Sequence, residues 1–465
     1  MTKLYYQFPN TWFGDCMPFG KGDQFYLFHQ RDTRKPCPFG EPFGWDLAVT
    51  SDFVHYEDKG TALPRGTDEE QDQFIFAGSV FEAEGKYHIF YTGFNRDYPK
   101  LGKASQVLMH AESDDLLNWT KTQDKLTFTP QEGYDPDDWR DPFVIWNEEK
   151  QEYLLVLGTR KAGPKEQQPG RTVKFPSKDL KNWKFEGDFW APGLFTMHEM
   201  PDLFQIGDWW YHIISEYSDG NKMVYRMSKS LDGPWIAPAD DAFDGRAYYA
   251  GRTFCLNGQR ILFGWVPTKE NCDDRGNFEW AGTFVAHEVY QRGDGTLGVR
   301  IPDTVWNAFD EGEKAEDIVI DTPYARQEQI LFNDTTDLFR FEADVEFSEG
   351  TRSFGLRFYE NEENGQSYQY LFNIKENRYR FETSPNMPWP ANQNIGLERP
   401  IRLEAGKKYH IQMILDDTIA TIYVDGVALN TRFYQKFGQS LSLFVTDGTL
   451  TVTNAGLSKA ISQKP

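Results

Sequence analysis

Three acidic residues that are far apart in the chain, Asp15, Asp141 and Glu199, have the side chains that cleavage of a glycosidic bond requires. In that reaction one carboxylic acid protonates the leaving oxygen, and a carboxylate acts as a nucleophile or as a base for water. Carboxyl groups that are packed together also push each other's pKa values apart, which decides which group carries the proton. The three residues therefore predict glycoside cleavage if the fold gathers them in one pocket.

Other polar residues accompany these acids. Arg140 directly precedes Asp141 and forms a charge pair with it at the start of an apolar strand. Ser79 and Arg252 occupy the corresponding places in two further units of the repeat described next. Asp202 lies further into its strand than the catalytic candidates, so we interpret it as a structural residue.

The elements that must position these residues are five predicted β-hairpins. Five short segments rich in β-branched and aromatic residues each follow a turn that contains Gly, Asp or Asn, which is typical of buried strands in hairpins. The segments are 24–29, 86–91, 153–157, 210–214 and 260–265.

A second repeat interleaves with the first. A Ser, an Asp and a closing aromatic residue recur in segments 51–56, 113–119, 177–183 and 230–235. Ser and Asp form turns, and we expect the aromatic residue to fill the space beside the next unit. Units of about four strands with a period of roughly 50–60 residues are the signature of a β-propeller. The innermost strands of a propeller open onto one face, so their first residues are predicted to converge there.

The chain is therefore predicted to be all-β, with a five-bladed β-propeller followed by a C-terminal β-sandwich. We expect residues 1–302 to form the propeller, which is the catalytic domain, residues 303–325 to form a linker, and residues 326–465 to form the sandwich. Regular strand-like runs separated by turns such as Asp425-Gly426 predict the sandwich. That part of the chain has no cluster of acids, His or Cys that resembles a site.

Composition excludes several classes of partner. The net charge of −22 would repel a nucleic acid, and no stretch of about 18 apolar residues could cross a membrane. The start of the chain lacks the pattern of a signal peptide. Four widely spaced cysteines are expected to be reduced thiols, so we expect a cytoplasmic protein. No cofactor or metal site is predicted, because the acidic run 135–141 lacks the ligand spacing and the Gly of a calcium loop.

At these segments the sequence resembles glycoside hydrolase family 32, the β-fructofuranosidases that include invertases, inulinases and levanases. Segment 139–142 looks like the Arg-Asp-Pro motif of that family, and segment 198–202 looks like its Glu-Cys-Pro motif with Met200 in place of Cys. Segment 77–79 is similar to the Phe-Ser-Gly-Ser region, and segments 248–254 and 260–265 are similar to the fifth blade. The order of propeller and sandwich extends the resemblance over nearly the whole chain.

The resemblance implies a retaining enzyme that releases terminal β-D-fructofuranosyl residues from sucrose or short fructo-oligosaccharides. Asp15 would be the nucleophile, Glu199 the general acid/base and Asp141 the transition-state stabiliser, while Arg140 would orient the acid. The aromatic content of 16% suits a sugar cleft, because sugar rings present apolar faces to aromatic rings. The further candidate sugar contacts are Gln30, Trp45, Asp46, Phe76 and Ser79.

The chain departs from the family before the nucleophile, where Gly14 replaces the usual Asn, so one sugar-binding amide is missing. Two alternatives stay open: a glycosidase acting on another furanoside of arabinofuranoside type, retaining or inverting, and a non-catalytic carbohydrate-binding propeller. Carboxyl groups about 5–5.5 Å apart favour retention, whereas about 6.5–9.5 Å favours inversion. The sequence leaves open hydrolysis versus transfer, phosphorylated versus free sugar, and the oligomeric state.

Overall fold

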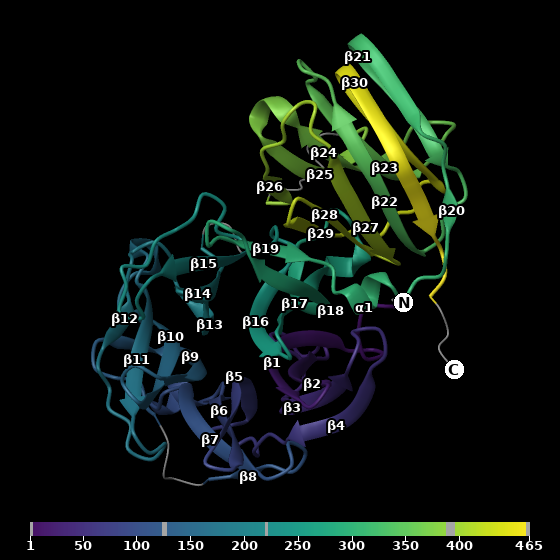
Figure 1. The fold of residues 1–465 in the computed structure, drawn as a ribbon. Coiled ribbons are helices and arrows are strands. Elements are labelled where there is room, and N and C mark those ends of the chain that lie inside the picture. Colours follow the sequence, from purple (N-terminus) through teal and green to yellow (C-terminus); the bar gives the residue numbers. More distant parts are fainter. Residues whose placement is uncertain (1–2, 123–127, 219–221, 387–395, 462–465) are drawn as a thin grey trace.

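The computed structural model describes residues 3–122, 128–218, 222–386 and 396–461. Over these residues the chain folds into a ring of β-sheets and a second all-β body that packs against one side of the ring (Figure 1). The predicted all-β fold class, a propeller followed by a sandwich, is confirmed. No helix in the described ranges is long and apolar enough to cross a membrane.

Three blades are separate antiparallel sheets. The second blade consists of β5 (Phe74–Ala83), β6 (Lys86–Phe94), β7 (Gln106–Ser113) and β8 (Thr120–Lys121). The third consists of β9 (Tyr134–Asn147), β10 (Glu152–Lys161), β11 (Gly170–Ser177) and β12 (Asp188–Trp190). The fourth consists of β13 (Glu199–Ile206), β14 (Trp209–Glu216) and β15 (Lys222–Ser228). Each innermost strand pairs with the next strand along the chain, so the predicted hairpins are present.

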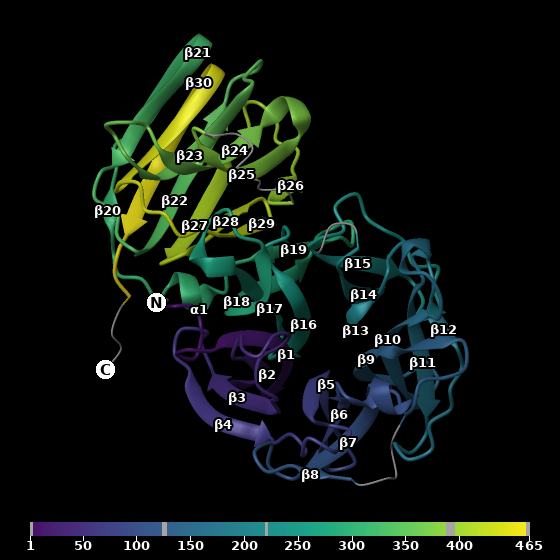
Figure 2. The same cartoon turned by 180° about the vertical axis from the view of Figure 1, so that it is seen from behind.

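The first and fifth blades close the ring by sharing one sheet (Figure 2). The first blade holds β1 (Trp12–Lys21), β2 (Gln24–Asp32), β3 (Trp45–Thr50) and β4 (Glu57–Leu63), and the fifth holds β16 (Tyr249–Leu256), β17 (Gln259–Lys269), β18 (Phe278–Gln291) and β19 (Leu297–Arg300). Strand β1 pairs with β18 through Phe13 and Gly282, which joins the start of the propeller to its end.

The Ser-Asp-aromatic repeat forms the turn after the third strand of a blade. In two blades an Asp accepts hydrogen bonds from backbone N–H groups two and three residues on, and the indole of the closing Trp donates to a backbone carbonyl. Trp119 packs edge-on against Phe28 at 5.8 Å, and Trp183 packs against Phe90 at 5.3 Å. The expected contact with the next blade is therefore wrong in direction: each aromatic residue packs against the preceding blade.

The sandwich is built around one long strand, β30 (Ser440–Ser458). Its first half pairs with β23 (Ser353–Glu360), and its second half pairs with β22 (Leu338–Phe347). Asp447, at φ 50°, lies where the partners change. The remaining strands are β24 (Ser367–Asn373), β25 (Arg378–Ser384), β26 (Glu398–Pro400), β27 (Tyr409–Asp416), β28 (Ile419–Val424) and β29 (Val427–Arg432).

The segment predicted as a linker, 303–325, is largely structured. It contains the short helix α1 (Asp303–Trp306), β20 (Glu313–Lys314) and the beginning of β21 (Ile318–Phe332), and both strands pair with β30. Strand β21 thus starts before residue 326, the predicted start of the sandwich. Its mostly exposed polar residues and its proline are typical of an edge strand, which is why its pattern looked like a linker.

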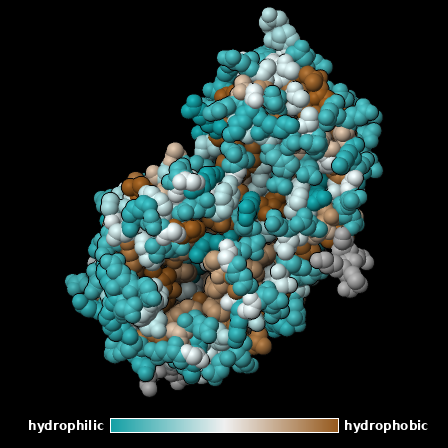
Figure 3. Space-filling view, viewed as in Figure 1, coloured by the Kyte–Doolittle hydropathy of each residue, from teal (hydrophilic) through white to brown (hydrophobic). Residues whose placement is uncertain are grey.

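A buried polar network joins the two bodies. Asp244 of the propeller accepts hydrogen bonds from the backbone N–H and the side-chain amide of Asn430 on β29, at 2.8 and 2.7 Å. It also lies 3.0 Å from Nε2 of His287 on β18, and Nδ1 of His287 lies 2.6 Å from the hydroxyl of Tyr423 on β28. These contacts fix the sandwich against the fifth blade. On the face shown in Figure 3, the surface is hollowed near the centre of the ring.

Candidate active site

The three predicted acids from three different blades line one cavity of about 400 Å³. Asp15 comes from β1, Asp141 from β9 and Glu199 from the first position of β13. Arg140, Gln30 and Phe76 line the same cavity. The predicted convergence of distant carboxylates at the mouth of the propeller is therefore seen in the structure.

A break in strand pairing aims these side chains. The innermost strand of every blade has a register shift in its pairing with the next strand, at Phe13/Cys16, Phe76/Gly78, the Arg140–Phe143 segment, Glu199/Asp202 and Tyr249/Arg252. Such β-bulges bend a strand and redirect its side chains. Asp141 is itself in the left-handed region at φ 65°, a costly conformation for a residue other than Gly. The acids occupy different places relative to the bulge, so they are not strictly equivalent residues of the repeat.

Glu199 is held from two sides. Arg140 donates a hydrogen bond from Nη2 to Glu199 Oε1 at 2.7 Å, and the hydroxyl of Tyr249 donates to Oε2 at 2.6 Å. Arg140 also pairs with Asp138 at 2.6 Å and lies 3.9 Å from Asp141. These contacts support the predicted role of Arg140, which is to orient Glu199.

Asp15 and Asp141 each have a different set of partners. The indole of Trp265 donates to Asp15 Oδ1 at 3.1 Å. The backbone N–H of Met200 donates to Asp141 Oδ2 at 3.0 Å, so Asp141 touches the residue that follows Glu199. The backbone N–H of Asp141 donates to the hydroxyl of Thr92 on β6 at 2.9 Å. The carboxylates are thus fixed by neighbouring blades.

Burial and mutual repulsion change the acidity of the two aspartates. Burial, together with the negative charges of Asp141 and Glu199, raises the pKa of Asp15 well above its ordinary value. Burial also raises the pKa of Asp141, to about 6, against the opposing effect of Arg140. Carboxyl groups so close together do not all ionise independently. The cavity therefore keeps a proton at a pH where isolated carboxyl groups have lost theirs.

Three predicted sugar contacts lie outside the cavity. Trp45 is fully buried behind it and donates its indole N–H to the carbonyl of Phe76. Asp46 pairs with Arg31 at 2.8 Å. Ser79 lies beyond the bulge of β5 and lines a separate cavity with Arg252. The prediction misplaced Ser79 because a bulge shifts every later residue by one position, and sequence alone does not fix where a bulge lies.

Several lining residues were not singled out from the sequence. The added aromatic residues are Phe39, Phe94 and Trp280, of which Phe94 stacks on Phe76 at 4.4 Å between ring centroids. Tyr249 falls in a segment similar to the family's fifth blade, but nothing in its spacing marked it as a partner of Glu199. Phe39 and Trp280 approach the cavity from parts of the chain outside the five innermost strands, so the hairpin pattern could not find them.

Neighbouring side chains leave no room for a larger residue at position 14, where the family usually has Asn. A Cβ at Gly14 would lie 2.8 Å from Cη2 of Trp280 and 3.0 Å from Cβ of Gln30. Trp280 therefore occupies the space where a larger residue before Asp15 would project. The neighbouring Cys16 thiol is buried, and burial raises its pKa well above the ordinary value, as expected for a packed thiol and not for a nucleophile.

Asp135 and Asp138, two acids of the run 135–141, form ion pairs with arginines. Arg160 pairs with Asp135 and Asp138, and Arg140 pairs with Asp138 as well. The run therefore supplies structural ion pairs beside the cavity.

Comparison with known proteins adds independent information. The family model described as Glycosyl hydrolases family 32 N-terminal domain matches residues 7–292, and that described as Glycosyl hydrolases family 32 C terminal matches residues 311–459. A levanbiose-producing levanase of Bacillus subtilis is 23% identical, covering 94% of this chain and 85% of that protein. A sucrose-6-phosphate hydrolase of Escherichia coli is 22% identical, covering 94% of this chain and 89% of that protein.

Solved structures share the fold. Fructan 1-exohydrolase IIa from Cichorium intybus superimposes with a TM-score of 0.80 at 15% identity, covering 100% of this chain and 98% of that chain. Sucrose-6-phosphate hydrolase from Lactobacillus gasseri gives a TM-score of 0.77 at 19% identity, covering 99% of this chain and 93% of that chain. Because the two family models together span almost the whole sequence, the chain belongs to glycoside hydrolase family 32.

Proposed function

We propose that this protein is a retaining β-fructofuranosidase that releases terminal β-D-fructofuranosyl residues from sucrose or short fructo-oligosaccharides. The observation that carries the proposal is the meeting of Asp15, Asp141 and Glu199 in one cavity, with Arg140 and Tyr249 bonded to Glu199. The named activities of family members of similar length, a levanase and a sucrose-6-phosphate hydrolase, support the same substrate class.

The geometry suggests a role for each acid. Asp15, held by Trp265, attacks the anomeric carbon, and Glu199 protonates the leaving oxygen. Water then hydrolyses the fructosyl-enzyme with Glu199 acting as base. Asp141, fixed by Met200 and Thr92, accepts hydrogen bonds from sugar hydroxyls and stabilises the positive charge that develops on the ring.

Substrate binding is also expected to change the ionisation of Asp15 and Asp141. In the free cavity burial raises the pKa values of both Asp15 and Asp141, which favours their protonated forms. Hydroxyl groups of a bound fructosyl ring that donate to the two aspartates favour their ionised forms.

A second cavity gives room for the leaving group. It has a volume of about 270 Å³, and Glu199 and Trp280 line both cavities. The general acid therefore stands between them, where the scissile bond of a substrate spanning both would lie. Tyr217 and Trp265 line the second cavity and offer apolar faces to a second sugar ring.

Kinetics of two variants test the proposal. Asp15→Asn and Glu199→Gln are each expected to lower the rate of sucrose hydrolysis by several orders of magnitude while the fold is kept. Nuclear magnetic resonance of products formed in methanol would show β-methyl fructoside for retention. Near wild-type turnover by either variant would remove its assigned role, and failure to cleave any furanoside would favour a sugar-binding propeller.

We further propose that the protein acts on small sugars in the cytoplasm. All four cysteines are free thiols, and Cys37, Cys255 and Cys272 are exposed, which suits a reducing compartment. Cell fractionation with an antibody against the protein tests this location, and recovery of the protein outside the cytoplasm would refute it.

A further inference from the structure

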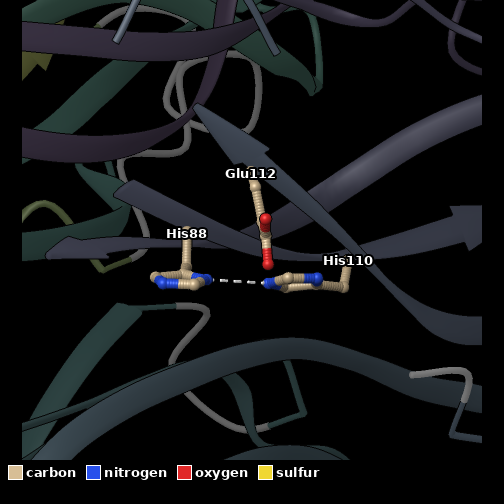
Figure 4. Close-up of side chains that lie close together, drawn as sticks. All are labelled: His88, His110 and Glu112. Atoms are coloured by element: carbon tan, nitrogen blue, oxygen red, sulfur yellow. Dashed lines mark hydrogen bonds between the residues drawn. The ribbon is translucent and has the colours of Figure 1, made fainter. Parts of the chain in front are cut away.

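Away from both sugar cavities, three potential metal ligands lie together on the second blade: His88 on β6, and His110 and Glu112 on β7. Their ligand atoms all lie within 4.8 Å of one another, and Figure 4 shows the two imidazoles edge to edge with the carboxylate of Glu112 beside them. The cluster depends on strand register, because His88 lies directly opposite Glu112, and His110 lies two residues before Glu112. Residues two apart in a strand share one face of the sheet.

In each histidine, the ring nitrogen that faces away from the other histidine has a hydrogen-bond partner. Nε2 of His88 lies 3.3 Å from the carbonyl oxygen of Ala83, which only accepts, so Nε2 carries the proton and Nδ1 presents a lone pair. Nδ1 of His110 lies 2.8 Å from the hydroxyl of Thr122, and that hydroxyl donates to the carbonyl of His110 at 3.3 Å. In the tautomer of His110 whose Nδ1 donates to this hydroxyl, Nε2 also presents a lone pair.

Nδ1 of His88 and Nε2 of His110 lie 3.1 Å apart and share a hydrogen bond (Figure 4). A metal ion bound to both nitrogens would take the place of the proton in this bond. Both histidines are buried. Neutral imidazole is the form that binds metals.

We propose that His88, His110 and Glu112 form a zinc site that ties β6 to β7. Two imidazoles and a carboxylate suit Zn²⁺, with water as a fourth ligand. The bonds from the outer ring nitrogens to Ala83 and Thr122 are the kind of contact that orients metal-binding histidines. Lys86, whose Nζ lies 3.2 Å from Glu112 Oε2, is the competing cation.

The proposed zinc site is connected to the cavity of the three acids through strand β6. Strand β6 also carries Thr92, which accepts the backbone N–H of Asp141. Zinc would thus clamp the strand that supports one of the three acids. The sequence did not predict this site, since residues 88, 110 and 112 come together only through the pairing of β6 with β7.

Calorimetric titration of the full chain with ZnCl₂, after removal of metal by a chelator, tests the proposal. We expect one equivalent of zinc to bind, and His110→Gln and Glu112→Gln each to weaken its affinity at least tenfold. Lys86→Gln is expected to strengthen binding severalfold, because it removes the cation that competes for Glu112. The matched control is His55→Gln, which alters an exposed His–Asp pair on the first blade and should leave zinc affinity unchanged.

Cobalt substitution distinguishes this site from the exposed cysteines. We expect the visible bands of a tetrahedral site without a thiolate charge-transfer band. A thiolate band, no zinc binding, or affinities unaffected by Glu112→Gln and Lys86→Gln would overturn the proposal. The last two variants alter partly exposed side chains, so they keep the test decisive even if His110→Gln does not fold.

Discussion

Single residues of the cavity are held by contacts from more than one blade. Glu199 of the fourth blade accepts hydrogen bonds from Arg140 of the third and Tyr249 of the fifth. Asp141 is bonded to Met200 and Thr92 on either side of its own blade. Because the acids are positioned by their neighbours, loss of one side chain changes both the charge and the alignment of the rest.

The raised pKa values give a prediction about pH. Asp15 must be ionised to attack, so kcat/KM falls as the pH drops through its raised pKa. Asp141→Asn removes one negative charge that raises the pKa of Asp15. We expect this variant to be slower and to have its acidic limb at a lower pH than the wild type, as measured by pH profiles of kcat/KM.

The exposed residue Asp97 provides the control for this prediction. Asp97→Asn removes the same formal charge from an exposed residue that pairs with Lys100, and its acidic limb is expected to match that of the wild type. An unshifted limb in Asp141→Asn would show that the charge of Asp141 does not influence Asp15.

Trp280 is expected to prevent the residue before Asp15 from being the Asn that is usual in the family. Gly14→Asn forces a side chain against Trp280 and Gln30, and overpacking of this kind costs about 1–3 kcal/mol. We expect a lower Tm and at least tenfold lower kcat/KM on sucrose. Adding Trp280→Ala makes room, so the double variant should regain much of the lost Tm, with Trp280→Ala alone as the reference. An unchanged Tm in Gly14→Asn would mean that Trp280 moves aside freely.

At the scale of elements, the regular part of the propeller was predictable and the irregular part was not. The hairpins follow from apolar segments and turns: Asn257 and Gly258 both have positive φ, as a tight hairpin turn requires. The bulges depend on which residues of two strands pair, and that is decided by contacts between blades. Of the predicted sugar contacts, Gln30 and Phe76 line the cavity and stay predictions, whereas Ser79, Trp45 and Asp46 lie outside it.

Arg252 binds backbone carbonyl groups beside the bulges of two innermost strands, β5 and β9. Its buried guanidinium donates to the backbone carbonyls of Gly78, Asp141 and Pro142. Each buried acceptor left unpaired costs about 1–3 kcal/mol, so Arg252→Met is expected to lower the free energy of unfolding in urea by about 3 kcal/mol or more.

A surface ion pair supplies the comparison. Arg378 is 41% exposed and pairs with Glu398, which is 39% exposed, and exposed pairs contribute about 0–1 kcal/mol. Arg378→Met should therefore have a small effect on urea unfolding. Equal losses in the two variants would argue against the role given to Arg252.

At the scale of the whole molecule, the propeller and the sandwich share a buried polar boundary. Asp244 is 2% exposed and satisfies donors from both bodies. Asp244→Ala leaves Asn430 and His287 without this acceptor, so we expect the boundary to weaken. Calorimetry should show the two bodies unfolding at separate temperatures in the variant and closer together in the wild type. The exposed Asp232, changed to Ala, is the control, and a single unshifted transition in Asp244→Ala would contradict the prediction.

The beginning of the chain depends on parts that are synthesised much later. The backbone N–H groups of Lys3, Leu4 and Tyr5 all donate to the carboxylate of Asp416, up to 413 positions along the sequence. Strand β1 also needs β18 before its sheet is complete. During translation the first blade must therefore wait, with an open edge that could aggregate, until β18, which ends at Gln291, has left the ribosome. Ring closure is thus a late event in the life of the nascent chain.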